Sequence, residues 1–192
     1  MKRGALIVLL VFNYQCKPAN SKLLLSSFEP FGSRDINISQ KLVEDLADSE
    51  NFTQVTLPVS FEESWTKLNK TLDSTKPSVV ILLGEHKYSS IRVDISAQNY
   101  YRDTYSEGKI DLHGPDFLPS PIAEDLPDIQ GLNFNEDAGR YVCNYVYYKS
   151  LQKNFNTVFL HVPELTDTEY RNKKQFLLSI LQQVIQHTAK FQ

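Results

Sequence analysis

The chain has 192 residues, of which 41% are hydrophobic and 22% are charged, and its formal net charge at pH 7 is −3. This balance is typical of one globular domain with enough apolar side chains to form a core. Because the net charge is slightly negative, the chain offers no basic surface for a nucleic acid, and that class of function is disfavoured. Its four histidines and two cysteines form no cluster with metal-ligand spacing, so no metal or cofactor is expected.

The first sixteen residues have the pattern of an export signal. Lys2 and Arg3 precede the apolar run 5–12, which is too short to cross a bilayer as a stable helix. The segment ends at Cys16, which is the lipid acceptor of a bacterial lipoprotein, or is removed with a cleaved signal, or belongs to a retained anchor. We therefore expect an exported protein, periplasmic, secreted or attached to the membrane through a lipid, with its folded domain over residues 22–192.

Strand and helix patterns alternate after the leader. In chain order, they predict a strand at 22–28, a helix at 37–48, a strand at 54–59, a helix at 60–74 and a strand at 78–84. The second helix opens with Ser60 and Glu63, which have the spacing of a capping box. The strand SVVILLG is apolar throughout, as expected for a strand that is buried on both faces of a parallel sheet.

The next strand, IRVDISA at 91–97, alternates apolar and polar residues, which predicts a half-exposed strand. The stretch 100–135 contains four prolines and is predicted to be a long irregular loop, and such loops usually serve a function or are loosely held. A buried strand follows at 157–163, and a long amphipathic helix with the capping-box residues Thr166 and Glu169 closes the chain. The alternation predicts an α/β fold with a largely parallel central sheet covered on both faces.

Cys143 lies near the start of a further predicted helix, at 141–152. It has no cysteine partner in the chain if Cys16 is lipidated or removed. A lone thiol is either a buried structural residue or a reactive group. We expect the helix to begin near residues 137–139, which would place Cys143 in its first turns, where the helix dipole favours a thiolate.

A thiol nucleophile needs a base and a group that orients the base. His161 ends the run TVFLHVP at the carboxyl end of a predicted strand, where active sites of open α/β sheets gather. The alternative is a core histidine whose partners are main-chain groups. Asp94 is the candidate carboxylate, although the alternation of its segment would equally place it in solvent. On the residues alone, Cys143, His161 and Asp94 are one triad among several.

Six blocks of the sequence resemble the cysteine-type pyroglutamyl peptidases, or pyrrolidone-carboxylate peptidases, in order and approximate spacing. They are SSFEPFG, LPVSFEES, VVILLG, IRVDISAQN, DAGRYVCNYVYY and FLHVP, which together extend from about Lys22 to Glu169. The resemblance implies a three-layer αβα sandwich with a largely parallel, mixed sheet. It also implies removal of N-terminal pyroglutamyl residues from peptides by a Cys–His–Glu triad, with Cys143 as the nucleophile and His161 as the general base. A homo-oligomer is left open.

The same resemblance indicates the walls of a substrate pocket. Phe28 and Phe31 match the phenylalanines that flank the flat lactam ring, and Tyr141 and Val142 match further wall residues. Aromatic walls suit a neutral five-membered lactam, because apart from its one amide the ring is apolar. Packing in the core is the alternative role for the two phenylalanines.

The chain departs from the family pattern around this site. Asp94 stands in place of a glutamate and is one methylene shorter, Glu85 replaces a glutamine, and Thr104 replaces an arginine. The sequence is therefore compatible with two functions: a pyroglutamyl peptidase, and a degenerate member that binds peptide ends in the cell envelope without catalysis. Retention of Cys143 and His161 favours the first. Hydrolysis of a different small amide would use the same triad and differ only in the pocket.

Overall fold

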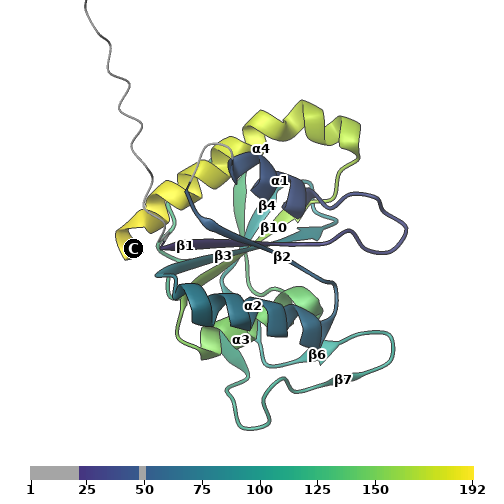
Figure 1. Ribbon diagram of the computed structural model, residues 1–192, viewed down its shortest axis with the longest axis vertical. Coiled ribbons are helices and arrows are strands. Elements are labelled where there is room, and N and C mark those ends of the chain that lie inside the picture. Colours follow the sequence, from purple (N-terminus) through teal and green to yellow (C-terminus); the bar gives the residue numbers. More distant parts are fainter. Residues whose placement is uncertain (1–21, 48–50) are drawn as a thin grey trace, which may run out of the picture.

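The computed structural model describes residues 22–47 and 51–192. The expected export signal and Cys16 lie outside the described residues. In the described part, a six-stranded sheet lies between two pairs of helices (Figure 1). This is the three-layer α/β architecture that the alternating sequence patterns predict.

The strand order of the sheet is β2-β1-β3-β10-β4-β9. The strands are β1 (Leu23–Phe28), β2 (Thr53–Leu57), β3 (Val79–His86), β4 (Ile91–Asp94), β9 (Leu132–Asn135) and β10 (Asn156–Pro163). All neighbouring strands are parallel except β10 and β4, which are antiparallel. The central strands β1, β3 and β10 are almost wholly buried, because helices cover both faces of the sheet.

Helices α1 (Ile38–Ala47) and α4 (Asp167–Thr188) cover one face, and α2 (Phe61–Thr75) and α3 (Val142–Gln152) cover the other (Figure 1). A short 3-10 helix, Ala189–Phe191, follows α4. Each face has its own apolar core, because successive side chains of a strand point to opposite sides. None of the helices in the described part is both long and apolar enough to span a bilayer.

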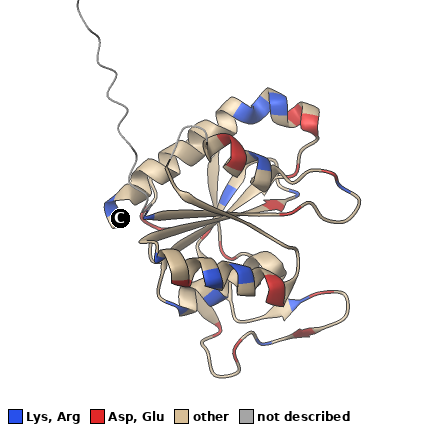
Figure 2. Ribbon diagram, viewed as in Figure 1, with Lys and Arg blue, Asp and Glu red and all other residues tan. Residues whose placement is uncertain are grey.

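Charged residues of both signs are spread over the helices and loops, as Figure 2 shows for the described residues. On α4, the acidic residues lie at the start of the helix and the basic residues follow them, whereas the strands of the sheet carry few charges (Figure 2). No strongly basic face stands out in this view, in keeping with the slightly negative net charge.

The two predicted capping boxes differ in outcome. At the start of α4, the Glu169 side chain accepts from the main-chain N–H of Thr166, and the Thr166 hydroxyl accepts from the N–H of Glu169. At the start of α2, Ser60 is the N-cap residue but makes no side-chain capping hydrogen bond, so that prediction was wrong.

The stretch 100–135 is largely irregular, as predicted, but it contains four short strands. These are β6 (Tyr101–Arg102), β7 (Glu107–Gly108), β8 (Phe117–Pro119) and β9. The predicted strand 91–97 is divided into β4 and β5 (Ser96–Gln98), and β5 pairs with β8. Strand β9 has four residues, too few for a periodic pattern to reveal, yet it covers the edge of β4.

Candidate active site

His161 and Asp94 come from adjacent strands and point to the same face of the sheet. Phe159 lies opposite Asp94 in the antiparallel pair β10–β4, and His161, two residues later, shares its face. His161 Nδ1 lies 2.7 Å from Asp94 Oδ2, and their side chains are 5% and 0% exposed. Asp94 is therefore buried, not solvated, and its shorter side chain still reaches the imidazole. His161 is buried, but its partner is a carboxylate and not a main-chain group.

Two further residues hold Asp94 in place. Asn135 Nδ2 donates to Asp94 Oδ1 at 2.9 Å, so both carboxyl oxygens have a partner. The Tyr147 hydroxyl donates to the main-chain oxygen of Asp94 at 3.0 Å. Both residues were missed in the sequence, and their positions just before the nucleophile block and within it are the only signals of a role. Their hydrogen bonds fix the orientation of the carboxylate that meets the imidazole.

Cys143 is the second residue of α3. The helix begins later than predicted, because Gly139 adopts a left-handed conformation with φ of 77° and its N–H binds the Asp137 side chain, which makes residues 137–139 a turn. The N-cap residue, Tyr141, makes no side-chain cap. The first N–H groups of a helix have no intrahelical partner, so they can bind negative charge that develops beside Cys143.

The thiol and the imidazole meet above β3. A hydrogen bond with Cys143 is one of the interactions that raise the pKa of His161. Because Asp94 occupies Nδ1, Nε2 is the ring nitrogen left for the thiol. Gly84 of β3 lies beside His161 in the parallel ladder, and a Cβ at this glycine would lie 2.7 Å from the Cys143 sulfur. A glycine therefore leaves room for the nucleophile.

The electrostatics of the site favour a protonated His161. Burial alone would lower the pKa of His161, but the hydrogen bonds and charges of Asp94 and Cys143 outweigh it and raise the pKa to about 10. A cationic imidazole beside a thiol stabilises the thiolate. His86 makes an edge contact with the His161 ring, and both burial and His161 lower the pKa of His86, so that ring tends to stay neutral.

Asn144 anchors the start of α3. Its side-chain amide donates to the main-chain oxygens of Gln98 and Tyr100 at 2.9 and 2.8 Å, and its oxygen accepts from the N–H of Gln98 at 2.7 Å. The side chain is fully buried. These three hydrogen bonds tie the residue next to Cys143 to β5 and the loop after it, and so fix the position of the nucleophile.

A small cavity of about 40 Å³ adjoins Cys143. It is lined by Phe28, Phe31, Asn37, Val59, Glu85, Tyr141, Val142 and Cys143. The four residues that the resemblance indicates as pocket walls thus lie around one cavity with the thiol. Phe28 also belongs to the core under α2 and α3, so it serves both roles. Asn37 and Val59 were not singled out in the sequence, and Thr104 lies exposed in the turn between β6 and β7.

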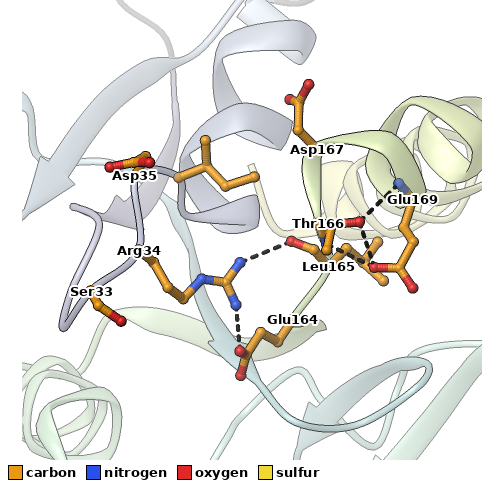
Figure 3. Close-up of a pocket in the computed structure, with 9 residues that line it drawn as sticks. Ser33, Arg34, Asp35, Glu164, Leu165, Thr166, Asp167 and Glu169 are labelled. Atoms are coloured by element: carbon orange, nitrogen blue, oxygen red, sulfur yellow. Dashed lines mark hydrogen bonds and ion pairs between the residues drawn. The ribbon is translucent and has the colours of Figure 1, made fainter.

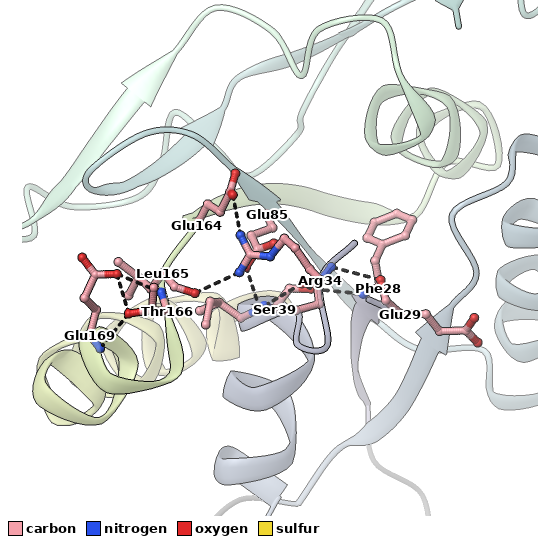
Figure 4. Close-up of polar contacts among 11 residues, drawn as sticks. Phe28, Glu29, Arg34, Ser39, Glu85, Glu164, Leu165, Thr166 and Glu169 are labelled. Atoms are coloured by element: carbon pink, nitrogen blue, oxygen red, sulfur yellow. Dashed lines mark hydrogen bonds and ion pairs between the residues drawn. The ribbon is translucent and has the colours of Figure 1, made fainter. Parts of the chain in front are cut away.

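A second, open cavity of about 540 Å³ lies between residues 33–36 and the start of α4 (Figure 3). Neither Cys143 nor His161 lines it. Arg34 crosses from this cavity toward Glu85: its guanidinium contacts Glu164 at 2.6 Å, the main-chain oxygen of Leu165 at 2.9 Å and Glu85 at 3.2 Å (Figure 4). Among the described residues, no group of His, Cys, Asp and Glu side chains is arranged to hold a metal ion.

Comparison with known proteins places these features in one family. A family model described as "Pyroglutamyl peptidase" matches residues 21–106. The chain is 30% identical over 173 residues to a pyrrolidone-carboxylate peptidase of Finegoldia magna, covering 76% of this chain and 80% of that protein. A pyrrolidone-carboxylate peptidase of Yersinia pestis is 27% identical over 174 residues, with the same coverage of 76% and 80%.

Solved structures show the same fold. A mutant pyrrolidone carboxyl peptidase from Pyrococcus furiosus matches with a TM-score of 0.74 at 24% identity, over 88% of this chain and 98% of that one. The pyrrolidone carboxyl peptidase from Thermococcus litoralis matches with a TM-score of 0.65 at 27% identity, over 76% of this chain and 77% of that one. The mixed, mostly parallel sheet between helices is therefore the fold of these peptidases.

Proposed function

Because the chain belongs to the pyroglutamyl peptidase family, we propose that it is a cysteine peptidase that removes N-terminal pyroglutamyl residues from peptides. The observation that carries this proposal is the setting of His161: its Nδ1 lies 2.7 Å from Asp94 Oδ2, and it lies beside Gly84, against which the Cys143 sulfur packs. The three groups have the roles that thiol hydrolysis needs: a nucleophile, a base and a carboxylate that orients the base.

In the proposed reaction, the proton of the Cys143 thiol already rests on Nε2 of His161, whose raised pKa favours the imidazolium, and the thiolate attacks the carbonyl carbon that links the pyroglutamyl group to the next residue. His161 then gives this proton to the leaving amine, and a thioester on Cys143 remains. Water that gives a proton to His161 attacks the thioester, releases pyroglutamate and restores the thiolate beside the protonated imidazole. Asp94 holds the Nδ1–H throughout, so Nε2 faces the reacting atoms.

The N-terminus of α3 and the adjoining cavity support the remaining parts of the reaction. The tetrahedral intermediate carries a negative oxygen, which main-chain N–H groups of the first turn of α3 are placed to bind. The walls of the cavity suit the lactam ring, because the side chains of Phe28, Phe31 and Val142 match its apolar faces. Neither step needs a metal or a cofactor.

The non-catalytic alternative rests on the departures from the family pattern. The Asp94 departure does not support it, because the carboxylate reaches the imidazole at 2.7 Å. Glu85, which stands in place of the family's glutamine, lines the pocket, and Thr104, which stands in place of the family's arginine, lies on an exposed turn. With the nucleophile and the base both beside Gly84, catalysis is the function that the geometry favours.

The proposed function is tested by the release of a fluorescent amine from a pyroglutamyl amide by the purified, reduced protein. The expected result is turnover of the pyroglutamyl amide, with at least about a hundredfold lower kcat/KM on the matching prolyl amide, whose cationic ring suits an apolar pocket poorly. Turnover that survives in Cys143→Ala would sink the proposal.

We also propose that the protein is exported. The support is the sequence alone: two basic residues followed by the apolar run 5–12 and Cys16. The intact mass of the protein isolated from its native host distinguishes a lipid on Cys16, which would attach it to the membrane, from a cleaved signal or a retained anchor. Sizing of the same sample tests the homo-oligomer that the sequence leaves open.

A further inference from the structure

Glu85 places a carboxyl group at the buried end of the cavity beside Cys143. It follows Gly84 on β3, and its side chain is only 1% exposed. Phe31 and Tyr141, which line the same cavity, are 41% and 48% exposed and therefore lie toward its mouth. A ring that enters past Phe31 and Tyr141 would thus meet Glu85.

The two oxygens of this carboxyl group differ in their partners. Oε1 accepts from the N–H of Ile38, the first residue of α1, at 2.9 Å and from Arg34 at 3.2 Å. Oε2 is buried and has no hydrogen-bond partner within the part of the chain that the structure describes. A buried polar atom without a partner is costly, so it marks a place for an atom of a ligand.

Several groups that carry or gain charge surround Glu85. Arg34 and the N–H of Ile38 favour its ionised form, but Arg34 shares its charge with Glu164. Cys143 and Tyr141 of the α3 segment line the cavity with it. Burial, with Glu164 acting in the same direction, outweighs the two stabilising contacts and raises the pKa of Glu85 above its ordinary value.

We propose that Glu85 is a specificity-determining residue that binds the lactam carbonyl of the substrate through a protonated Oε2. A lactam has one carbonyl acceptor and one N–H donor. The N–H is bonded to the carbon that carries the scissile carbonyl, whereas the lactam carbonyl lies one atom farther on. With the scissile carbonyl at Cys143, the lactam carbonyl therefore points toward the buried end. The inference rests on the proposed function for its choice of ligand.

The proton belongs on Oε2 because Oε1 already accepts two hydrogen bonds. A neutral Glu85 donates to the carbonyl, whereas an ionised Glu85 presents a second acceptor and repels it. Binding of the ring should therefore weaken as the pH rises through the pKa of Glu85. A glutamine at this position would donate at every pH, so the glutamate makes recognition of the ring pH-dependent.

The test measures how 2-pyrrolidone protects Cys143 from iodoacetamide, from about pH 5 to about pH 8. The 2-pyrrolidone concentration that halves the labelling rate reports binding without any turnover. In the unaltered protein this concentration should rise with pH, toward about tenfold per unit above the pKa of Glu85. In Glu85→Gln it should stay constant and equal the low-pH value. Glu164→Gln, which removes a carboxylate outside the cavity, should keep the rise with pH but move it to lower pH, because Glu164 helps to raise the pKa of Glu85.

A half-protection concentration that is constant or falls with rising pH in the unaltered protein overturns the inference, as does an absence of protection. The pH dependence of protection in the unaltered protein tests the inference even if Glu85→Gln fails to fold. The outcome is also separate from that of the proposed function. Protection with the expected pH dependence, but without hydrolysis of pyroglutamyl amides, would refute only the proposed function. Hydrolysis of pyroglutamyl amides without pH-dependent protection would refute only the role of Glu85.

Discussion

Gly84 on β3 lies directly against the sulfur of Cys143 on α3. A Cβ at this position would be 2.7 Å from the Cys143 sulfur and 2.8 Å from the ring of Phe159, and both distances are shorter than real Cβ contacts. The glycine therefore allows the helix that carries the nucleophile to approach the strand. The same approach brings the thiol to His161, which lies beside Gly84 in the sheet.

Gly84→Ala should disturb the site more than the fold. The added methyl group must push aside the thiol or the Phe159 ring, so kcat/KM should fall at least about tenfold, with a loss of roughly 1–3 kcal/mol in the free energy of unfolding. Steady-state kinetics and urea unfolding measure the two effects. Gly108→Ala is the matched control, because its Cβ would meet only contacts of 3.5 Å or longer. Unchanged kinetics of Gly84→Ala would contradict this packing.

Asp94→Asn should lower kcat by about three to four orders of magnitude. Asn135 donates to Oδ1, so the new amide would keep its oxygen toward Asn135 and turn its NH2 group to His161. The imidazole would then carry its proton on the nitrogen that faces Cys143, which is the wrong tautomer for a base. Asp94→Glu should also lower activity, because the carboxylate already reaches His161 in a fully buried site. Full activity of Asp94→Asn would show that another acid orients His161.

Stability should fall as the pH rises toward 10. The pKa of His161 is raised to about 10 in the folded protein from an ordinary value of about 6.5, so protonated His161 stabilises the fold. That contribution is fully present below about pH 6.5 and is lost as the pH rises through about 10. Urea unfolding across this range should show the loss, and His161→Gln should lack it. If the free energies of unfolding of the two proteins depend on pH in the same way, the raised pKa of His161 is contradicted.

Cys143 should react with iodoacetamide at pH 7 roughly tenfold or more faster than a free cysteine, because an adjacent histidine activates a thiol nucleophile. Asp94→Asn, which removes the charge that holds the proton on His161, should slow the reaction. Intact mass of protein from the native host should show one labelled thiol and no disulfide. A bond between Cys16 and Cys143 there would instead favour a non-catalytic protein.

Most helices and strands follow from apolar periodicity, but the setting of Asp94 does not. Its strand alternates and so looks half-exposed, yet the Asp94 side chain meets His161 of β10 and Asn135 of β9 and is fully buried. The four residues of β9 carry too little pattern to predict that cover. The two capping boxes also look alike in the sequence but differ in the structure: Glu169 binds Thr166, whereas at the start of α2 the Ser60 side chain makes no capping bond.

The placement of Cys143 and His161 near one another was predictable from the resemblance, because their motifs are specific, and their catalytic roles stay a prediction. Glu85 was visible only as a change of residue, since its meaning depends on burial. One oxygen of its carboxyl group is tied to Arg34 and the other is left without a partner, a difference that no spacing in the chain reveals.

Covalent catalysis by Cys143 is tested most directly by the mass of the protein quenched in acid during turnover of a pyroglutamyl ester, followed by peptide mapping. Because deacylation by water is the slower step for an activated ester, the protein should gain one pyroglutamyl group, carried by the peptide that contains Cys143. Cys143→Ala should gain none. Turnover without an adduct on Cys143, or an adduct on another residue, would contradict Cys143 as the nucleophile.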